Sequence, residues 1–513
     1  MRKSILKAIF TISFFAVLTR AASFGFKVIL SRTLGAELLG IYQVGVSVFF
    51  VLLAVTASGI PLVVSKMTAK HRVQKDIKSE HGVFTGALII NIVCAAAICL
   101  FILVLREPLS RRFTSPQSFI VLLLLLPCIA ASSVQMAARG NLWGRQLFRD
   151  VCLIDFVETT LRIVVCILLF VFFDNHLYSA AASLSIAYFV SAIIGAIVYF
   201  KRKGRFASPK GHIKPLIKSS VPITMVRAST TITASLIAIF IPFILTTFQG
   251  STTPEALYFL GATIGMALPI LYVPNTVIGA MAFVLVPTLS ESSEGGQGAK
   301  DRLKVQIEQA VIFSVVISAI FIPALLIMGR SATMFLFGNE LAGQFLTFAA
   351  LLLIPIGIES ITSSIMNSLG LEIQGFVNYI LGAILMFGYM FLVRHSFNAL
   401  HLTVALGIML TFSSILDVLA IKRKTGAGYK FLIPLGITIA ILIPSTIFTY
   451  FMYNIMALPA FLQLAVTGIL SVAFVVTLMI IFGVIKLSVF TNERVKGNKK
   501  DRPMPVKLAS KKR

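Results

Sequence analysis

The chain has 513 residues, of which 58% are hydrophobic and only 12% are charged, and its formal net charge is +26. A soluble domain of this size needs more charge on its water-facing surface, so the composition excludes a soluble globular protein. Charge-free tracts as long as the roughly 20 residues that span a bilayer recur along the chain. They predict an all-α polytopic membrane protein, because backbone groups in lipid must bond within their own helix.

Fourteen apolar tracts, separated by charged or Pro/Gly-rich breaks, predict fourteen transmembrane helices. In chain order they cover residues 5–30, 39–65, 83–105, 118–138, 151–173, 177–200, 219–247, 256–286, 307–329, 343–367, 375–393, 400–421, 431–453 and 459–486.

The distribution of Lys and Arg orients these helices. If both termini are cytoplasmic, the inner loops and tails hold 34 of the 45 basic residues, the outer loops hold 6 and the spans hold 5. Cytoplasmic loops carry such an excess, so we predict a multi-pass membrane protein with both ends inside. The positive charge then lies mostly on the cytoplasmic side, where it attracts anionic lipid headgroups, and it does not indicate nucleic-acid binding.

The sequence divides into two similar halves. A helix bearing Arg20 and a span ending GIPLVVSK open the first half, and a helix bearing Arg227 and a span ending VLVPTLSE open the second. Internal repeats are typical of transporters, whose substrate site lies between them. The predicted units are an N-terminal lobe of helices 1–6 (1–200), a basic cytoplasmic linker (201–218), a C-terminal lobe of helices 7–12 (219–421), helices 13–14 (422–486) and a basic cytoplasmic tail (487–513).

Basic residues lie inside the first predicted helix. A charge at the bilayer centre costs about 2.5–3.5 kcal/mol on insertion scales, so one that is retained usually faces protein or water. Arg20 and Lys27 are seven residues apart, nearly two turns, and share a face that Ser13 extends. The alternative is that such long side chains snorkel to the headgroups. Arg32 lies on a different face near the outer surface, and we expect it to be an interfacial anchor.

A second polar stripe follows the seventh predicted helix. Ser220, Thr224, Arg227, Thr231 and Ser235 recur at helical spacing, with the arginine at the centre. Because Arg227 is flanked by hydroxyls on its own face, the stripe predicts one wall of a wet cavity.

Together these cations predict a cavity that binds an anion. Arginine suits phosphate through its planar fork, and hydroxyl-rich faces suit sugars. A lipid-linked saccharide diphosphate satisfies both, and it needs a protein to carry its head group across the bilayer. The candidate substrate-binding residues are Arg20, Lys27, Arg227, Lys66, Ser13, Thr224 and Thr231.

Acidic residues inside the helices are fewer. Glu158 and Arg162 are an i,i+4 pair with Asp155 one turn earlier, and this spacing predicts an internally neutralised pair that holds helices in register. Glu359 stands among hydroxyls in IESITSSIMNS and is either a bonded packing residue or a site for a coupling proton or Na⁺. All four residues are structural or coupling candidates.

Motifs of enzymes and metal sites are absent from the sequence. The five cysteines lie in apolar tracts without metal or redox spacing, and the six histidines form no HxxH or HExxH pattern. There is no G-x-S-x-G and no P-loop. We therefore predict a transporter without a metal centre or a cofactor, and not an enzyme.

Several segments carry a family resemblance. TRAASFGFKVILSRTLGAELLGIYQ, GIPLVVSK, ARGNLWGRQ, VETTLRIVV, GMALPILYVP and VLVPTLSE resemble, in this order, the stage V sporulation protein B and polysaccharide-biosynthesis group. That group belongs to the multidrug/oligosaccharidyl-lipid/polysaccharide exporter superfamily and is similar to lipid II flippases. The resemblance implies two six-helix lobes around a central cavity, two extra C-terminal helices, and alternating access that moves an undecaprenyl-diphosphate-linked saccharide outward. By this resemblance, the basic residues that line the cavity in the family correspond to Arg20, Lys27, Arg227 and Lys66. Lysine at 27 departs from the arginine of lipid II flippases.

Four functions compete. The first is a flippase for a peptidoglycan precursor such as lipid II, and the second is an exporter of another lipid-linked unit, of capsule or teichoic type. A cation-coupled multidrug exporter usually needs a membrane-embedded carboxylate, which the opening helix lacks. A scaffold for envelope-synthesis enzymes would not need deep charges. The energy source, the saccharide and any restriction to sporulation are open at this level.

Overall fold

The computed structural model describes residues 2–279, 281–282, 289, 297–427 and 431–485, and this part of the chain is helical without strands. The helices are α1 (Arg2–Ala57), α2 (Ile60–Val73), α3 (Ile77–Val104), α4 (Arg106–Ser110), α5 (Pro116–Gly144), α6 (Phe148–Phe172), α7 (His176–Lys201), α8 (Ile213–Phe248), α9 (Thr253–Leu260), the π-helix η1 (Gly261–Ala267), α10 (Leu268–Leu271), α12 (Gln297–Phe337), α13 (Glu340–Ala349), the 3₁₀-helix η2 (Ala350–Leu352), α14 (Leu353–Ser368), α15 (Glu372–Leu392), α16 (Ala399–Thr425), α17 (Leu432–Ile455) and α18 (Ala460–Ile481).

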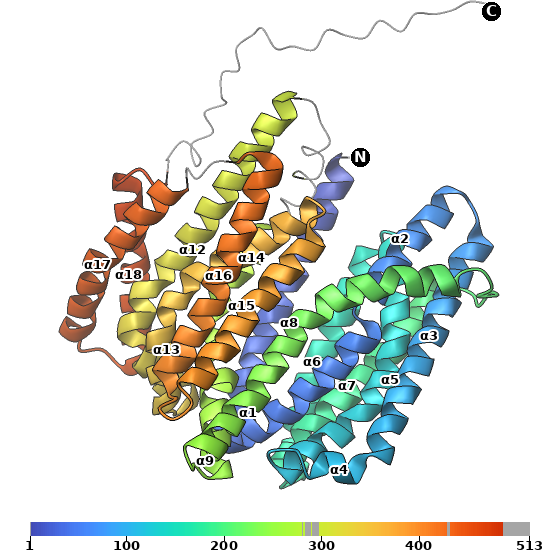
Figure 1. The fold of residues 1–513 in the computed structure, drawn as a ribbon, viewed down its shortest axis with the longest axis horizontal. Coiled ribbons are helices and arrows are strands. Elements are labelled where there is room, and N and C mark those ends of the chain that lie inside the picture. The colour runs from blue at the N-terminus through green and yellow to red at the C-terminus, as the bar shows by residue number, and fades with distance from the viewer. Residues whose placement is uncertain (1, 280, 283–288, 290–296, 428–430, 486–513) are drawn as a thin grey trace, which may run out of the picture.

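Two helical bundles make up the structure (Figure 1). The helices α2 to α7 form one bundle and α12 to α18 form the other, while α1 and α8 run between them. The bundles lie close together at the end that carries α4 and α9, and they diverge toward the end at which the chain begins. Under the predicted topology, the diverging end faces the cytoplasm.

Twelve helices in the described residues are long and apolar enough to cross a membrane, which confirms a multi-pass membrane protein. Two differences separate this number from the fourteen expected spans. The stretch Val17–Val73 contains both of the first two expected spans. The helix α6 does not reach the same apolarity, because Asp155, Glu158 and Arg162 lie near its middle.

A bend at Gly35 explains the first difference. Gly35 has φ 70° and ψ 177°, a non-helical conformation at positive φ that glycine adopts without the clash of a Cβ atom. The chain turns there, so the two halves of α1 form the arms of a V (Figure 1). Arg20 and Lys27 lie on the first arm, and Gln43 and Ser47 lie on the second.

Two further glycines let backbones touch at the closed end of the molecule. A Cβ atom at Gly40 would overlap the carbonyl of Leu257, and one at Gly261 would overlap the carbonyl of Ala36. The second arm of α1 therefore packs directly on α9 and η1, with no side chain between them. This contact joins the two bundles where they converge.

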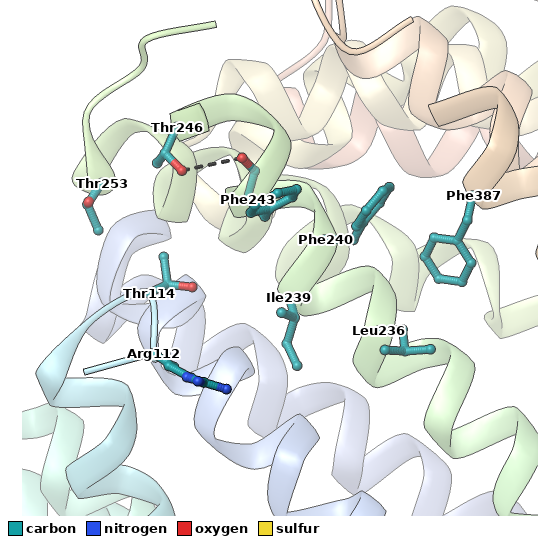
Figure 2. A pocket seen from close by; sticks show the side chains of 9 residues that line it. All are labelled: Arg112, Thr114, Leu236, Ile239, Phe240, Phe243, Thr246, Thr253 and Phe387. Atoms are coloured by element: carbon teal, nitrogen blue, oxygen red, sulfur yellow. Dashed lines mark hydrogen bonds between the residues drawn. The ribbon is translucent and has the colours of Figure 1, made fainter. Parts of the chain in front are cut away.

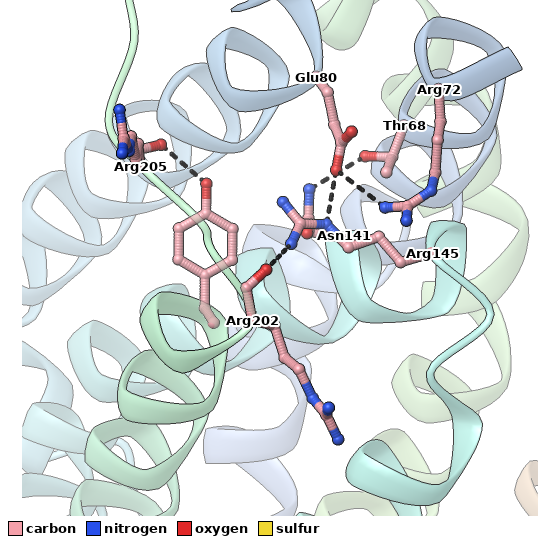
Figure 3. Close-up of polar contacts among 8 residues, drawn as sticks. Thr68, Arg72, Glu80, Asn141, Arg145, Arg202 and Arg205 are labelled. Atoms are coloured by element: carbon pink, nitrogen blue, oxygen red, sulfur yellow. Dashed lines mark hydrogen bonds and ion pairs between the residues drawn. The ribbon is translucent and has the colours of Figure 1, made fainter. Parts of the chain in front are cut away.

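A buried ion pair holds the first bundle together at its other end (Figure 3). The Arg145 Nε, at the end of α5, lies 2.5 Å from the Glu80 carboxylate on α3, and each of these side chains is only 4% exposed. The Arg145 Nη1 donates to the Arg202 carbonyl at the end of α7, at 2.7 Å. Arg72 of α2 approaches Glu80 at 3.8 Å from an exposed position. Two hydrogen bonds from Arg202 to Asp150 of α6 raise the pKa of the Arg202 guanidinium and extend the network to a fifth helix.

We expect Glu80→Gln to destabilise the protein by about 3–5 kcal/mol, because it leaves the Arg145 guanidinium buried without its counter-charge. Thermal unfolding of the full chain in detergent measures the loss. Arg72→Ala is the control and should cost less than about 1 kcal/mol, since exposed ion pairs contribute little. The double variant Glu80→Gln/Arg145→Met should regain most of the stability. If Glu80→Gln and Arg72→Ala lost equal amounts of stability, the assignment of Arg145–Glu80 as the central pair would be contradicted.

Candidate functional site

Arg20 lies on the first arm of α1 and reaches across to the second half of the chain. Its two terminal nitrogens lie 3.8 and 3.9 Å from the place that a Cβ atom at Gly279 would take. The side chain is exposed and has no ion-pair partner among the described residues. The predicted polar neighbour Ser13 has a side chain outside the part that the structure describes.

Lys27 lies two turns further along and meets a second cation. Its ammonium interacts electrostatically with the Arg162 guanidinium of α6 and is surrounded by protein on most sides, while the side chain keeps an accessible surface. Arg162 stacks on the Phe26 ring at 5.0 Å, and its buried Nε has no hydrogen-bond partner in the described structure. Because the two groups carry like charges, their interaction is repulsive, and an anion bound beside them would reduce this repulsion.

The prediction of an ion pair between Glu158 and Arg162 is wrong. Glu158 instead accepts a hydrogen bond from Gln135 of α5 at 2.5 Å, and Asp155 forms an ion pair with Arg139 of α5 at 2.7 Å. Gln135 and Arg139 are one turn apart on α5, and they face acidic residues that are one turn apart on α6. The neighbouring helix thus supplies closer partners than α6 itself, and no described carboxylate pairs with Arg162.

Arg227 on α8 adds a third uncompensated cation. It is exposed, and the charge that it interacts with is Arg139, which Asp155 already neutralises. The guanidinium of Arg139 also lies over the Trp143 ring at 4.9 Å. Arg227 therefore faces α5 without a carboxylate of its own among the described residues.

A pocket of about 470 Å³ lies on the same face of α8, one turn beyond Arg227. Hydroxyl and amide groups from α1 and α8 line it together with apolar side chains. The lining residues are Gln43, Ser47, Phe50, Leu53, Ala54, Ser58, Met136, Thr230, Thr231, Ala234 and Ser235.

The other predicted residues of the polar stripes lie elsewhere. Thr224 accepts a hydrogen bond from the Gly59 N–H at 3.2 Å, so it packs α8 against the start of α2. Lys66 is exposed on α2. Arg32 donates from its Nε to the Leu336 carbonyl at 2.7 Å, in the last turn of α12, where the helix dipole favours a cation. Arg32 is thus a structural contact between α1 and α12.

Two carboxylates lie close together in the second bundle. Asp417 of α16 accepts hydrogen bonds from Asn378 at 2.7 Å and Thr362 at 3.4 Å, and Glu359 of α14 interacts electrostatically with it. Within the described residues, no group of three or more His, Cys, Asp or Glu side chains is placed to hold a metal ion. Among the described residues, neither Glu359 nor Asp417 forms an ion pair.

The chain is similar to known proteins of polysaccharide biosynthesis and sporulation. The model of the polysaccharide biosynthesis protein family matches residues 5–293. Stage V sporulation protein B of Bacillus subtilis (strain 168) is 22% identical over 390 residues, which are 73% of this chain and 75% of that protein.

Solved structures with the same fold are transporters. The inward-facing conformation of a multidrug resistance MATE family transporter of the MOP superfamily covers 81% of this chain and 98% of its own, with a TM-score of 0.66 and 15% identity. The outward-facing conformation of such a transporter covers 82% of this chain and 96% of its own, with a TM-score of 0.63 and 15% identity. The chain therefore has the fold of the MOP superfamily.

We expect Arg162→Met to stabilise the ligand-free protein by about 1 kcal/mol, because it removes a charge that Lys27 repels and that no carboxylate neutralises. Thermal unfolding in detergent without any substrate measures the change. Arg32→Met is the matched control and should destabilise by about 1 kcal/mol, since it removes hydrogen bonds to the end of α12. If Arg162→Met lost as much stability as the control Arg32→Met, Arg162 would have a structural role.

Proposed function

Because this chain belongs to the polysaccharide biosynthesis protein family, we propose that it is a flippase that moves an undecaprenyl-diphosphate-linked saccharide from the inner to the outer leaflet. The substrate that we assign is a peptidoglycan precursor such as lipid II. The observation that carries the proposal is the set of cations Lys27, Arg162 and Arg227, which form no ion pair within the described structure.

A diphosphate is the anion that suits these cations. Its two phosphate groups offer several acceptor oxygens, and each guanidinium can bind them through two parallel hydrogen bonds. Lys27 supplies charge without this bidentate geometry. Binding would therefore remove the repulsion between Lys27 and Arg162. Part of the affinity would come from the loss of this repulsion.

The hydroxyl-lined pocket beside Arg227 suits the saccharide. Sugar hydroxyls exchange hydrogen bonds with side chains that both donate and accept, such as Thr230, Thr231 and Gln43. The lipid chain stays in the bilayer while the polar head crosses between the bundles. Divergence of the bundles at one end and contact at the other provide the access that such a step needs (Figure 1).

A multidrug exporter is a weaker assignment for the same cavity. A cationic drug needs a free carboxylate near these cations. Asp155 and Glu158 are held by Arg139 and Gln135, and the Glu359 and Asp417 pair lies in the second bundle. A capsule or teichoic unit carries the same diphosphate and remains the second candidate. The similarity to stage V sporulation protein B supports a role in sporulation, and the peptidoglycan precursor is the substrate that we assign.

We assign the coupling of transport to the Glu359 and Asp417 pair. Two carboxylates that interact in a low-dielectric site share one proton or bind a small cation, and their occupancy then depends on the ion gradient. Transport driven by H⁺ or by Na⁺ would act through this pair, and Glu359→Gln should remove the dependence on the gradient.

Transport is tested by rescue of cells depleted of their own lipid II flippase, with the head group assayed at the outer leaflet. Wild type should restore exposure, and Arg20→Ala, Arg162→Ala and Arg227→Ala should each lower the rate about tenfold or more, because each removes a charge-assisted hydrogen bond. Arg149→Ala, at an exposed site on α6, is the control and should keep the full rate. The assay repeated with the H⁺ or the Na⁺ gradient collapsed identifies the coupling ion.

Two outcomes would overturn parts of this proposal. If all three single variants, Arg20→Ala, Arg162→Ala and Arg227→Ala, kept full transport activity, the cavity assignment would be excluded. The wild-type protein could instead fail to transport lipid II and yet transport a capsule or teichoic unit in reconstituted vesicles. That result would make the capsule or teichoic unit the substrate in place of the peptidoglycan precursor.

A further inference from the structure

A second pocket, of about 490 Å³, shares no lining residue with the hydroxyl-lined pocket of the proposed substrate site (Figure 2). Its size falls in the range of about 300–1,000 Å³ that is usual for small-ligand sites. It lies between α8 and the connection from α4 to α5, near the end of the molecule opposite the amino terminus. Its lining residues are Arg112, Thr114, Leu236, Ile239, Phe240, Phe243, Thr246, Thr253 and Phe387.

One wall of this pocket is a single apolar face of α8. Leu236, Ile239, Phe240 and Phe243 follow the helical spacing i, i+3, i+4 and i+7. Phe387 of α15 packs edge-on against Phe240, with 5.3 Å between ring centroids. Leu236, Ile239 and Phe243 remain 46%, 41% and 45% exposed, so the pocket has room for an apolar chain along α8.

The rim of the pocket is polar and positively charged. Arg112 extends from the connection between α4 and α5 toward the face of α8 that carries Ile239 (Figure 2). Among the described residues, no carboxylate pairs with Arg112. Thr114 lies beside it, and Thr246 and Thr253 stand at the end of α8 and the start of α9. The pocket therefore combines one free cation and several hydroxyls with a long apolar wall.

We propose that this pocket binds one anionic phospholipid, with its phosphate at Arg112 and an acyl chain along the apolar face of α8. An unpaired guanidinium attracts phosphate, and a net negative head group compensates it better than a zwitterionic one. The site shares no residue with the hydroxyl-lined pocket or with the three cations of the cavity. It is thus a lipid site distinct from the proposed substrate site.

Such a lipid would bridge the two bundles. Arg112 and Thr114 connect to the first bundle through α5, while Phe387 belongs to α15 of the second. Separation of the bundles at this end would pull the phosphate contact away from the acyl-chain contact. The bound lipid therefore stabilises the arrangement in which this end is closed.

Native mass spectrometry of the full, delipidated protein tests the proposal with phosphatidylglycerol and phosphatidylcholine of matched chains. We expect wild type to retain one phosphatidylglycerol and to bind phosphatidylcholine about tenfold more weakly. Arg112→Ala should weaken phosphatidylglycerol binding about tenfold, since it removes a charge-assisted hydrogen bond. Arg112→Lys should keep most of it. The control Arg111→Ala, at the adjacent exposed arginine, should keep all of it.

A second variant tests the acyl-chain wall without touching the charge. Ile239→Trp should fill the groove and lower phosphatidylglycerol binding several-fold, and an unchanged Tm would show that it still folds. Equal binding of the two lipids, or unchanged binding by Arg112→Ala, would overturn the proposal. Displacement of the lipid by millimolar inorganic phosphate would show a simple phosphate site. Preferential binding of undecaprenyl phosphate would make the carrier lipid the occupant and likewise refute a phospholipid site.

Discussion

The hydrogen bonds between α5 and α6 determine the electrostatics of the cavity. Arg139 and Gln135 of α5 bind Asp155 and Glu158 of α6, so both acidic side chains are satisfied within the first bundle. Arg162, one turn beyond Glu158, is thereby left to face Lys27 of α1. Arg139 neutralises Asp155, whereas the neutral amide of Gln135 leaves the negative charge of Glu158 on α6, one turn before Arg162. Under the proposed function, a bound diphosphate would reduce the repulsion between Lys27 and Arg162.

A backbone contact determines where this cavity can open. Gly40 and Gly261 let α1 touch α9 and η1 without intervening side chains, so the bundles meet closely at one end. The bend at Gly35 lies next to this contact and separates the two arms of α1. The first arm carries Arg20 and Lys27, and the second arm lines the hydroxyl-rich pocket. One helix with one bend thus supplies both the charged and the hydroxyl groups of the proposed site.

The sequence predicted the all-α membrane architecture because apolar tracts and the Lys/Arg asymmetry are local signals. It also singled out Arg20, Lys27 and Arg227, since a charge inside an apolar tract is visible without a structure. The role of Arg162 could not be predicted, because the i,i+4 rule considers only partners on the same helix, whereas Gln135 and Arg139 come from another. The pair of Arg145 and Glu80 was missed for the same reason: the two residues are 65 positions apart and meet only through packing. Gly35 lies in the predicted break between the first two spans, but the sequence did not show that helix continues on both sides of it with a bend at positive φ.

The most direct test of the central claim is an experimental structure of the full chain with a lipid-linked saccharide diphosphate bound. We expect the diphosphate within hydrogen-bond distance of Arg162 and Lys27, with the saccharide toward Thr230 and Thr231. Binding of the diphosphate elsewhere, with Lys27 and Arg162 still uncompensated, would contradict it.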